Sequence, residues 1–325
     1  MMGVTLALAS AAFFGLNNAT VRRGVLKSTV LQGMAITVPL GVPIFAGFAF
    51  AMGGYDALAG WDFPAWLWMS LAGVVHFVVG RYGNYRATQT LGATLSTPVQ
   101  QLSILVALVL AFIFLGETVN LINAIGIGLI MLGPMVLVAR RKQAVSTGKT
   151  KGFEPQFALG MVWGAVCALG YGASPLLIAM GLGSDPALAD AVAGVLVSYT
   201  AASIVVILLV VFAGGRSYLS TLDHHSAKWF LISAVFVAMS QLFRYLALAV
   251  APVSVVVPLQ RLSVVFRLLF NGLINRDYEV FDRHVVISIF LALLGTIALT
   301  MDSAFLLSLF GFQSQDVGPL IVPLF

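Results

Sequence analysis

The chain has 325 residues, of which 60% are hydrophobic and only 9% are charged, and its mean hydropathy is +1.02. Soluble domains carry roughly 25% charged residues, so this composition excludes a chain that exposes most of its surface to water. The net charge of +5 does not indicate nucleic-acid binding, because most Lys and Arg residues lie in short segments between apolar runs, and the single cysteine, Cys167, excludes an intrachain disulfide.

Apolar runs of about 17–25 residues recur along the chain, and each is long enough to cross a hydrocarbon core of about 30 Å. They predict ten transmembrane helices, at 3–21, 30–52, 65–82, 92–115, 119–139, 158–180, 188–213, 229–250, 253–272 and 285–303. We expect the first run to be a retained helix and not a signal peptide, because no basic leader precedes it. The predicted fold class is an all-α integral membrane protein.

The two halves of the chain resemble each other. A shift of 160 positions lays residues 98–103 (PVQQLS) on 258–263 (PLQRLS), and a shift of 157 lays Gly15 and Gly24 on Gly172 and Gly181. We therefore predict two five-helix repeats, at 1–139 and 158–303, joined by a basic loop at 140–157 and followed by an apolar tail at 304–325. An odd number of helices per repeat makes the second repeat enter the membrane from the opposite side, which gives inverted topology.

Basic residues occupy every second predicted loop. They are Arg22, Arg23 and Lys27, then Arg81 and Arg86, five residues in 140–157, Arg216 and Lys228, and Arg276 and Arg283. The loops between them carry aspartates instead, at positions 56, 62, 185 and 190. By the positive-inside rule the basic loops face the cytoplasm, so both termini are predicted to lie outside a cell inner (plasma) membrane.

Three arginines lie inside predicted spans, at Arg244, Arg261 and Arg267. A central Arg costs about 2.5–3.5 kcal/mol on translocon scales, and no Asp or Glu lies deep enough in a predicted span to neutralise them. This uncompensated charge favours an anionic ligand, or the carboxylate of a zwitterion. The alternative is that the arginines bond backbone carbonyls or snorkel to lipid phosphates.

Polar residues also share helix faces at equivalent positions of the two repeats. Gln260, Ser263 and Arg267 stand at i, i+3 and i+7, and Gln100 and Ser103 repeat the first two. Matching polar stripes predict a wet cavity at the membrane midplane, between the repeats. Interhelical hydrogen bonding, worth about 0.6 kcal/mol per contact in membranes, is the alternative interpretation.

Further candidates have both a functional and a structural interpretation. Side chains that could line the same pathway are Asn17, Asn18, His76, Tyr85, Tyr171 and Tyr245. His76 could relay protons, but a single histidine on an apolar helix face more often has a packing role. Three prolines, Pro98, Pro175 and Pro258, are hinge candidates or tolerated kinks. Asp223-His224-His225 is predicted to be a solvated loop, and no metal or cofactor is expected.

Three features carry a family resemblance. They are Leu115-Gly116-Glu117 after the fourth predicted helix, the Gly-rich run 125–133, and the opening around Gly15-Leu16-Asn17-Asn18. With them the chain resembles EamA-like members of the drug/metabolite transporter superfamily up to about residue 303. The resemblance implies a ten-helix bundle with a central cavity and alternating access. It also implies that both termini lie in the cytoplasm, which conflicts with the loop charges. We follow the loop charges and predict that both termini lie outside. The second repeat departs from the pattern, with Asn275-Arg276-Asp277 in place of Leu-Gly-Glu.

The sequence thus predicts a secondary transporter, an exporter or exchanger of a small organic metabolite, and not an enzyme. Its expected partners are that small molecule and the lipid bilayer, and a homodimer is left open. One alternative is a membrane-embedded enzyme acting on lipid-linked substrates, which would need a convergent acid/base set. Another is a structural subunit, which would need no solvated cavity.

Overall fold

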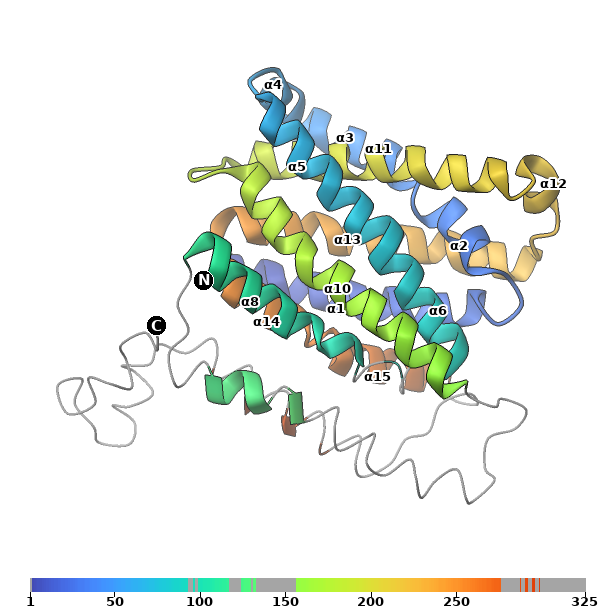
Figure 1. Ribbon diagram of the computed structural model, residues 1–325. Coiled ribbons are helices and arrows are strands. Elements are labelled where there is room, and N and C mark those ends of the chain that lie inside the picture. Colours follow the sequence, from blue (N-terminus) through green and yellow to red (C-terminus); the bar gives the residue numbers. More distant parts are fainter. Residues whose placement is uncertain are drawn as a thin grey trace.

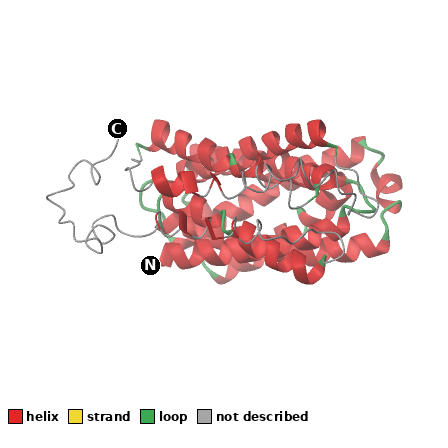
Figure 2. Cartoon of the chain, turned by 90° about the horizontal axis from the view of Figure 1, so that it is seen from below, coloured by secondary structure: helices red, strands yellow, loops and turns green. Residues whose placement is uncertain are grey.

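The protein is represented by a computed structural model that describes residues 2–92, 96, 99–116, 124–129, 131–132 and 156–275, with six single positions between 287 and 298. Every regular element in the described ranges is a helix (Figures 1 and 2). The predicted helices 119–139 and 285–303, the loop 140–157 and the tail 304–325 lie mostly or wholly outside the described residues, so their boundaries stay predictions.

The helices follow one another in the order shown in Figure 1. In the first half they are α1 (Met2–Gly24), α2 (Val30–Thr37), α3 (Gly41–Ala51), α4 (Gly54–Ala59), α5 (Phe63–Gly73), the π-helical η1 (Val74–Gly80), α6 (Arg81–Leu91) and α8 (Ser103–Leu115). In the second half they are α10 (Phe157–Leu182), α11 (Leu188–Phe212), α12 (Gly215–Ser220), α13 (His224–Val250), α14 (Val253–Gln260) and α15 (Ser263–Ile274).

Seven helical segments of the described chain are long and apolar enough to cross a membrane, and the helix Val99–Leu115 is a shorter eighth. Large apolar side chains such as Phe50, Phe212 and Leu273 are at least 80% exposed on the outside of the bundle. Many polar side chains, by contrast, are buried inside it, where most of them form hydrogen bonds within the bundle. The chain is a multi-pass membrane protein.

The helices form two lobes that do not coincide with the sequence halves. Helix α1 packs mainly against α13, α14 and α15 of the second half, whereas α10 packs mainly against α5, η1, α6 and α8 of the first half. We call these groups the α1 lobe and the α10 lobe. Each half therefore lends its first helix to the other half, and the space between the lobes is lined by both halves.

Equivalent contacts recur in the two lobes. A Cβ on Gly15 would lie 2.5 Å from Phe266 Cβ, and one on Gly172 would lie 2.5 Å from Val106 Cβ, where residues 106 and 266 are related by the 160-residue shift. Both glycines therefore let a first helix approach the backbone of a fourth helix closely. These matched contacts are what two copies of one helical unit are expected to make.

A break interrupts the fourth helix of each half at the same register position. Helix α8 begins at Ser103 after Leu102, and α15 begins at Ser263 after Leu262. Around the second break, the N–H groups of Leu262, Val264 and Val265 bond carbonyls three residues back, at 2.8–3.1 Å. These tighter turns satisfy the backbone where the regular ladder stops. The helix predicted at 253–272 is present as one apolar span, Val253–Ile274, with this tightening inside it, and the described part of the helix predicted at 92–115 runs from Val99 to Leu115.

The predicted helix end at 82 is wrong, because α5, η1 and α6 run without a gap to Leu91 and end at Gly92, whose φ of 85° is left-handed. Arg81, predicted to lie in a cytoplasmic loop, is 1% exposed inside the bundle. It donates to the Thr37 carbonyl at 3.2 Å and to the Tyr199 hydroxyl at 2.9 Å. That carbonyl is available because α2 ends there, and a cation at a helix C-terminus is stabilised by the helix dipole.

We predict that Gly15→Ala lowers the unfolding free energy by about 1–3 kcal/mol, because the new methyl would overlap Phe266 and the backbone N of Arg267, at 2.5 and 2.8 Å. Thermal unfolding in detergent measures the change. The matched control is Gly47→Ala in α3, where a Cβ meets nothing within 4 Å. Equal unfolding temperatures for the two variants would contradict the close approach of α1 and α15.

A second prediction concerns Asp223, which was predicted to lie in a solvated loop but caps the N-terminus of α13. The Ser226 backbone N–H donates to its carboxylate at 3.0 Å and lowers the pKa of Asp223, with a smaller contribution from the Ser226 hydroxyl. A lowered folded-state pKa stabilises the fold above the unfolded value of about 3.9, and this contribution is lost as the pH falls through the folded-state pKa.

Asn is also a good cap but does not titrate, so the difference in unfolding temperature between the parent and Asp223→Asn should be constant above about pH 5 and change below about pH 4. Thermal unfolding of both proteins at a series of pH values, from below about pH 4 to above about pH 5, measures this difference. A difference that stays flat across the range would show that the cap contributes no pH-dependent stability.

Candidate functional site

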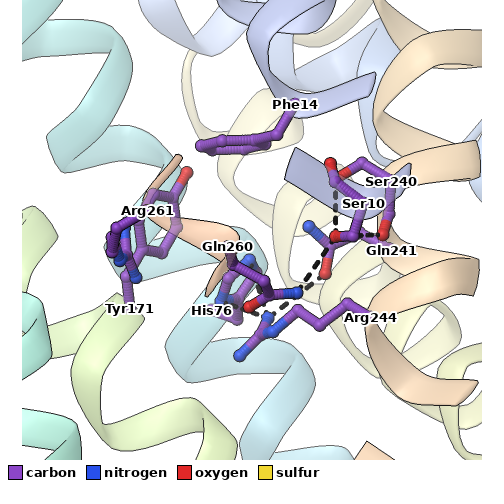
Figure 3. A pocket seen from close by; sticks show the side chains of 9 residues that line it. All are labelled: Ser10, Phe14, His76, Tyr171, Ser240, Gln241, Arg244, Gln260 and Arg261. Carbon is purple, nitrogen blue, oxygen red and sulfur yellow. Dashed lines mark hydrogen bonds between the residues drawn. The ribbon is translucent and has the colours of Figure 1, made fainter. Parts of the chain in front are cut away.

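A polar pocket lies between the two lobes, near the middle of the membrane-spanning helices (Figure 3). The α1 lobe contributes most of its lining, and the α10 lobe contributes two aromatic rings. The lining residues are Ser10, Phe14, His76, Tyr171, Ser240, Gln241, Arg244, Gln260 and Arg261. Ser10 and Phe14 lie near the centre of α1, whose 23 residues span about 34 Å, so the pocket lies close to the midplane.

The free space inside the pocket is about 20 Å³, which is enough for a water molecule. Small-molecule sites in proteins usually enclose roughly 300–1,000 Å³. The lobes are therefore closed around a water-sized space in this structure. A small molecule larger than water does not fit in the pocket in this conformation.

Arg244 of α13 is held by neutral partners from both lobes. Its Nη2 donates to Ser174 Oγ at 2.6 Å, and its Nη1 lies 2.8 Å from His76 Nδ1 and donates to Gln241 Oε1 at 3.2 Å. His76 also bonds Ser174 at 2.8 Å and stacks on Tyr171, with ring centroids 4.4 Å apart. A histidine nitrogen that accepts from a guanidinium is unprotonated, so His76 acts here as a neutral acceptor.

Arg261 is the second cation of the pocket. It follows α14 directly at the helix break, and its side chain is half-buried. Its Nε is buried without a partner, and the described residues provide no side-chain hydrogen bond to this guanidinium. A buried donor without an acceptor costs about 1–3 kcal/mol, and more for a charged group. Arg261 is therefore a cation facing the pocket with unused hydrogen-bonding capacity.

Small hydroxyl and amide groups close the remaining wall, on the α1 lobe. Ser10 and Ser240 exchange bonds, each hydroxyl donating to the other's carbonyl at 2.8 and 2.9 Å. Gln260 Nε2 donates to Ser10 Oγ at 3.0 Å (Figure 3). These groups can both donate and accept, so they suit the polar part of an organic solute.

The predicted polar stripes meet, but only one of them reaches the pocket. Gln260 lines the pocket, whereas Gln100 is buried outside the pocket lining and accepts from Arg267 Nη1 at 3.3 Å. Arg267 is 4% exposed and also donates to Ser96 and Thr88, at 3.2 and 3.4 Å. The stripe divides because the break at Leu262 separates Gln260 from the helix that carries Arg267.

Several predicted residues lie in hydrogen-bonded contacts away from the pocket. The Tyr85 hydroxyl donates to Thr37 Oγ1 at 3.3 Å, and the Tyr245 hydroxyl donates to Ser198 Oγ at 2.8 Å. Asn17 Oδ1 accepts from Ser233 at 2.6 Å, and Asn18 Oδ1 accepts from Asn84 at 3.2 Å. Ser103 and Ser263 are the buried first residues of α8 and α15. In this structure these residues join the helices to one another.

The hinge candidates have separate positions. Pro258 lies inside α14, three residues before Arg261. Pro175 lies inside α10, about one helical turn after Tyr171, which lines the pocket. Pro98 lies outside the described residues. The break near Pro258 fits the hinge interpretation, because proline removes a backbone donor and weakens the ladder.

Sequence reasoning missed Ser10, Phe14, Ser240 and Gln241, although Ser240-Gln241 one turn before Arg244 is a polar cluster in an apolar run. It also missed Arg81, because the arginine was assigned to a loop. Within the described residues no group of three or more His, Cys, Asp or Glu side chains could hold a metal ion. The pair His224 and His225 begins α13, where His225 Nε2 accepts from Trp229.

Comparison with known proteins gives matches to transporters. Residues 1–139 match the EamA-like transporter family, as the sequence resemblance predicted. The chain is 30% identical over 142 residues to magnesium transporter NIPA3 of Pongo abelii, which is 44% of this chain and 30% of that protein. It is 29% identical over 149 residues to probable magnesium transporter NIPA2 of Arabidopsis thaliana, 45% and 38% of the two chains. The match thus spans about a third of these relatives.

The fold is known from solved structures. One crystal structure superimposes with a TM-score of 0.66 and 15% sequence identity, over 91% of this chain and 96% of the other. At this identity the likeness shows the fold alone.

We predict that the pocket is wet. With Cys167 replaced by Ala, a cysteine at Gln260 should react with a small anionic thiosulfonate whenever the lobes separate enough to admit it, because position 260 lines the pocket beside two cations. In the unmodified protein Cys167 should resist the same reagent, since it is 0% exposed. Mass spectrometry of the intact protein measures the modification. Equal resistance of the two thiols would indicate a dry interface at this position.

Proposed function

We propose that this chain, a multi-pass membrane protein whose first 139 residues match the EamA-like transporter family, is a secondary transporter of a small organic anion or zwitterion. The solute would bind between the lobes and cross by alternating access. One observation carries the proposal: the guanidinium of Arg261 faces the midplane pocket, which Arg244 also lines, and the described residues provide it with no side-chain hydrogen bond.

The charge of the pocket supports an anionic group on the solute. Two of its nine residues are arginines, and none is Asp or Glu. A guanidinium offers a planar fork of donors that matches a carboxylate, and charge-assisted bonds of this kind are about twice as strong as neutral ones. A carboxylate in the pocket would neutralise Arg261 and satisfy its donors together.

Magnesium transport is the second candidate, because both named relatives are described as magnesium transporters. Mg²⁺ prefers carboxylate and water oxygens in near-octahedral geometry. The pocket offers hydroxyl and amide oxygens but no carboxylate, and its two guanidinium groups repel a divalent cation. The pocket chemistry therefore favours the anion over Mg²⁺ as the cargo of this chain.

The architecture supports rocking of the two lobes. Matched glycine contacts and helix breaks relate the halves by the register shift seen in the sequence, which agrees with two five-helix repeats of inverted topology. Few polar side chains bridge the lobes at the pocket, where Arg244 contacts His76 and Ser174. Separating the lobes there requires breaking a small number of hydrogen bonds.

The proposed orientation uses the charges that remain outside the bundle. Arg216 lies in α12, and Lys27 lies in the loop before α2, whose Gln32 donates to the Tyr218 carbonyl of α12. Asp56 lies in α4 at the opposite end of the molecule (Figure 1). Trp61 donates to Asp190 at 2.9 Å, which places the loop after α10 at the α4 end as well. A cytoplasmic α12 end in the plasma membrane would leave both termini outside, with the transporter acting as an exporter or exchanger.

An enzyme acting on lipid-linked substrates is less well supported, because the nine pocket residues include no Asp, Glu, Cys or Lys to pair with His76. A purely structural subunit has no use for a cationic pocket with unused donors. The small molecule and the lipid bilayer remain the proposed partners, and a homodimer is left open.

We predict that L-lactate, succinate, inorganic phosphate or glycine raises the thermal stability of the purified protein, whereas Mg²⁺ does not. A ligand at ten times its Kd stabilises the fold by about 1.4 kcal/mol. Arg261→Gln should abolish this stabilisation because it removes the charge that faces the pocket. A differential scanning fluorimetry series measures both proteins.

The control is Arg216→Gln in α12, an exposed arginine whose loss should leave every ligand effect unchanged. Stabilisation of the parent by Mg²⁺, without stabilisation by any of the four organic or phosphate probes, would favour magnesium transport and reject the anion site.

A further inference from the structure

Arg267 joins the two lobes at a second position, between the pocket and the α12 end of the bundle. Its backbone belongs to α15 and packs tightly on Gly15 of α1, so it is fixed to the α1 lobe. Its guanidinium reaches into the first half, where Gln100, Ser96 and Thr88 accept from it. Thr88 lies in α6, and Gln100 lies just before α8, both in the α10 lobe. One side chain therefore bridges the lobes at three points.

These three bonds are weak for a buried charge. Their lengths are 3.2–3.4 Å, longer than the usual 2.9–3.0 Å of an N–H···O bond. All three acceptors are neutral hydroxyl or amide oxygens, whereas a carboxylate acceptor would form a bond about twice as strong. An anion that reached Arg267 would therefore displace these acceptors.

Arg267 lies on the route from the pocket to one end of the bundle. Helix α15 runs parallel to α1, since Gln260 bonds Ser10 and Arg23, at the end of α1, bonds the Ile274 carbonyl. Arg267 is six residues beyond Arg261, or roughly 9 Å further along the helix direction. The end beyond it is the one that carries Lys27 and α12 (Figure 1).

Polar groups continue from the pocket along this route. Asn84 of α6 donates to Tyr171, which lines the pocket, and to Asn18 of α1. Asn84 Oδ1 and Gln100 Nε2 are buried and have no hydrogen-bond partner. A donor and an acceptor left unused inside an apolar bundle are costly, and they are what a passing hydrated or polar solute would satisfy.

We propose that Arg267 is an anion-operated gate: the transported anion passes from Arg261 to Arg267, replaces Gln100, Ser96 and Thr88 as its acceptor, and so releases the lobes at the α12 end. This proposal rests on the anionic substrate proposed above. It assigns to Arg267 a second binding position and the coupling of occupancy to opening. An empty transporter then stays closed at this end while Arg267 remains bonded to the α10 lobe.

The gate is tested by the accessibility of position 263, the buried first residue of α15 between Arg261 and Arg267. With Cys167 replaced by Ala, a cysteine at Ser263 is labelled with a membrane-impermeant maleimide in vesicles of both orientations. Addition of succinate should accelerate labelling from the α12 end. Arg267→Gln should accelerate it about tenfold or more without succinate, since it removes three inter-lobe hydrogen bonds.

Gln100→Ala provides a second variant that retains the arginine and removes one acceptor, and it should accelerate labelling by a smaller factor. Arg216→Gln, outside the bundle, should leave the rate unchanged. Thermal unfolding of each variant verifies that it is folded before labelling.

The proposal is overturned if folded Arg267→Gln and Gln100→Ala are labelled at the parent's rate. It is also overturned if succinate stabilises the parent in the fluorimetry series but leaves labelling unchanged, an outcome that keeps the anion site at Arg261. Absence of stabilisation by all four probes removes the anion site itself, and the gate with it, whatever the labelling rates.

Discussion

The arrangement of this protein depends on placing guanidinium groups inside an apolar bundle without carboxylates beside them in the described residues. Arg81 bonds the Thr37 carbonyl, freed where α2 ends, and Arg23 bonds the Ile274 carbonyl at the end of α15. Helix C-termini carry partial negative charge, so they are the natural neutral partners of a buried cation. A carbonyl at a helix end has no partner in the regular ladder, so it accepts a guanidinium donor without competition.

The same constraint separates structural arginines from functional ones. A guanidinium whose acceptors are backbone carbonyls at helix ends is fixed, and moving it would expose those carbonyls. Arg244 is held by a serine, a histidine and a glutamine, Arg267 has neutral side-chain partners, and Arg261 has none in the described residues. Side-chain acceptors can rotate away when a stronger anion arrives. The three cations that the proposed anion would meet thus follow one path along the α1 lobe.

Exchange of first helices between the halves would allow the proposed transporter to rock one lobe against the other. Because α1 belongs with α13–α15 and α10 with α5–α8, each lobe is held together by contacts between distant parts of the sequence. The lobes meet at the pocket through few polar contacts and at Arg267 through weak ones. The sequence halves and the two lobes are therefore different divisions of the chain, and the midplane pocket belongs to neither half alone.

Composition and the length of the apolar runs were enough to predict a helical membrane protein and the three interior arginines Arg244, Arg261 and Arg267. Apolar run length and residue type are local properties, and the bilayer imposes them directly. Arg81 was misplaced in a loop, and Ser10 and Phe14 were overlooked, because neither periodicity nor charge shows which helix a side chain faces. Only the packing of α1 on the second half decided that Gln260 lines a pocket while Gln100 binds Arg267, since the two glutamines are equivalent in sequence and differ only in their neighbours.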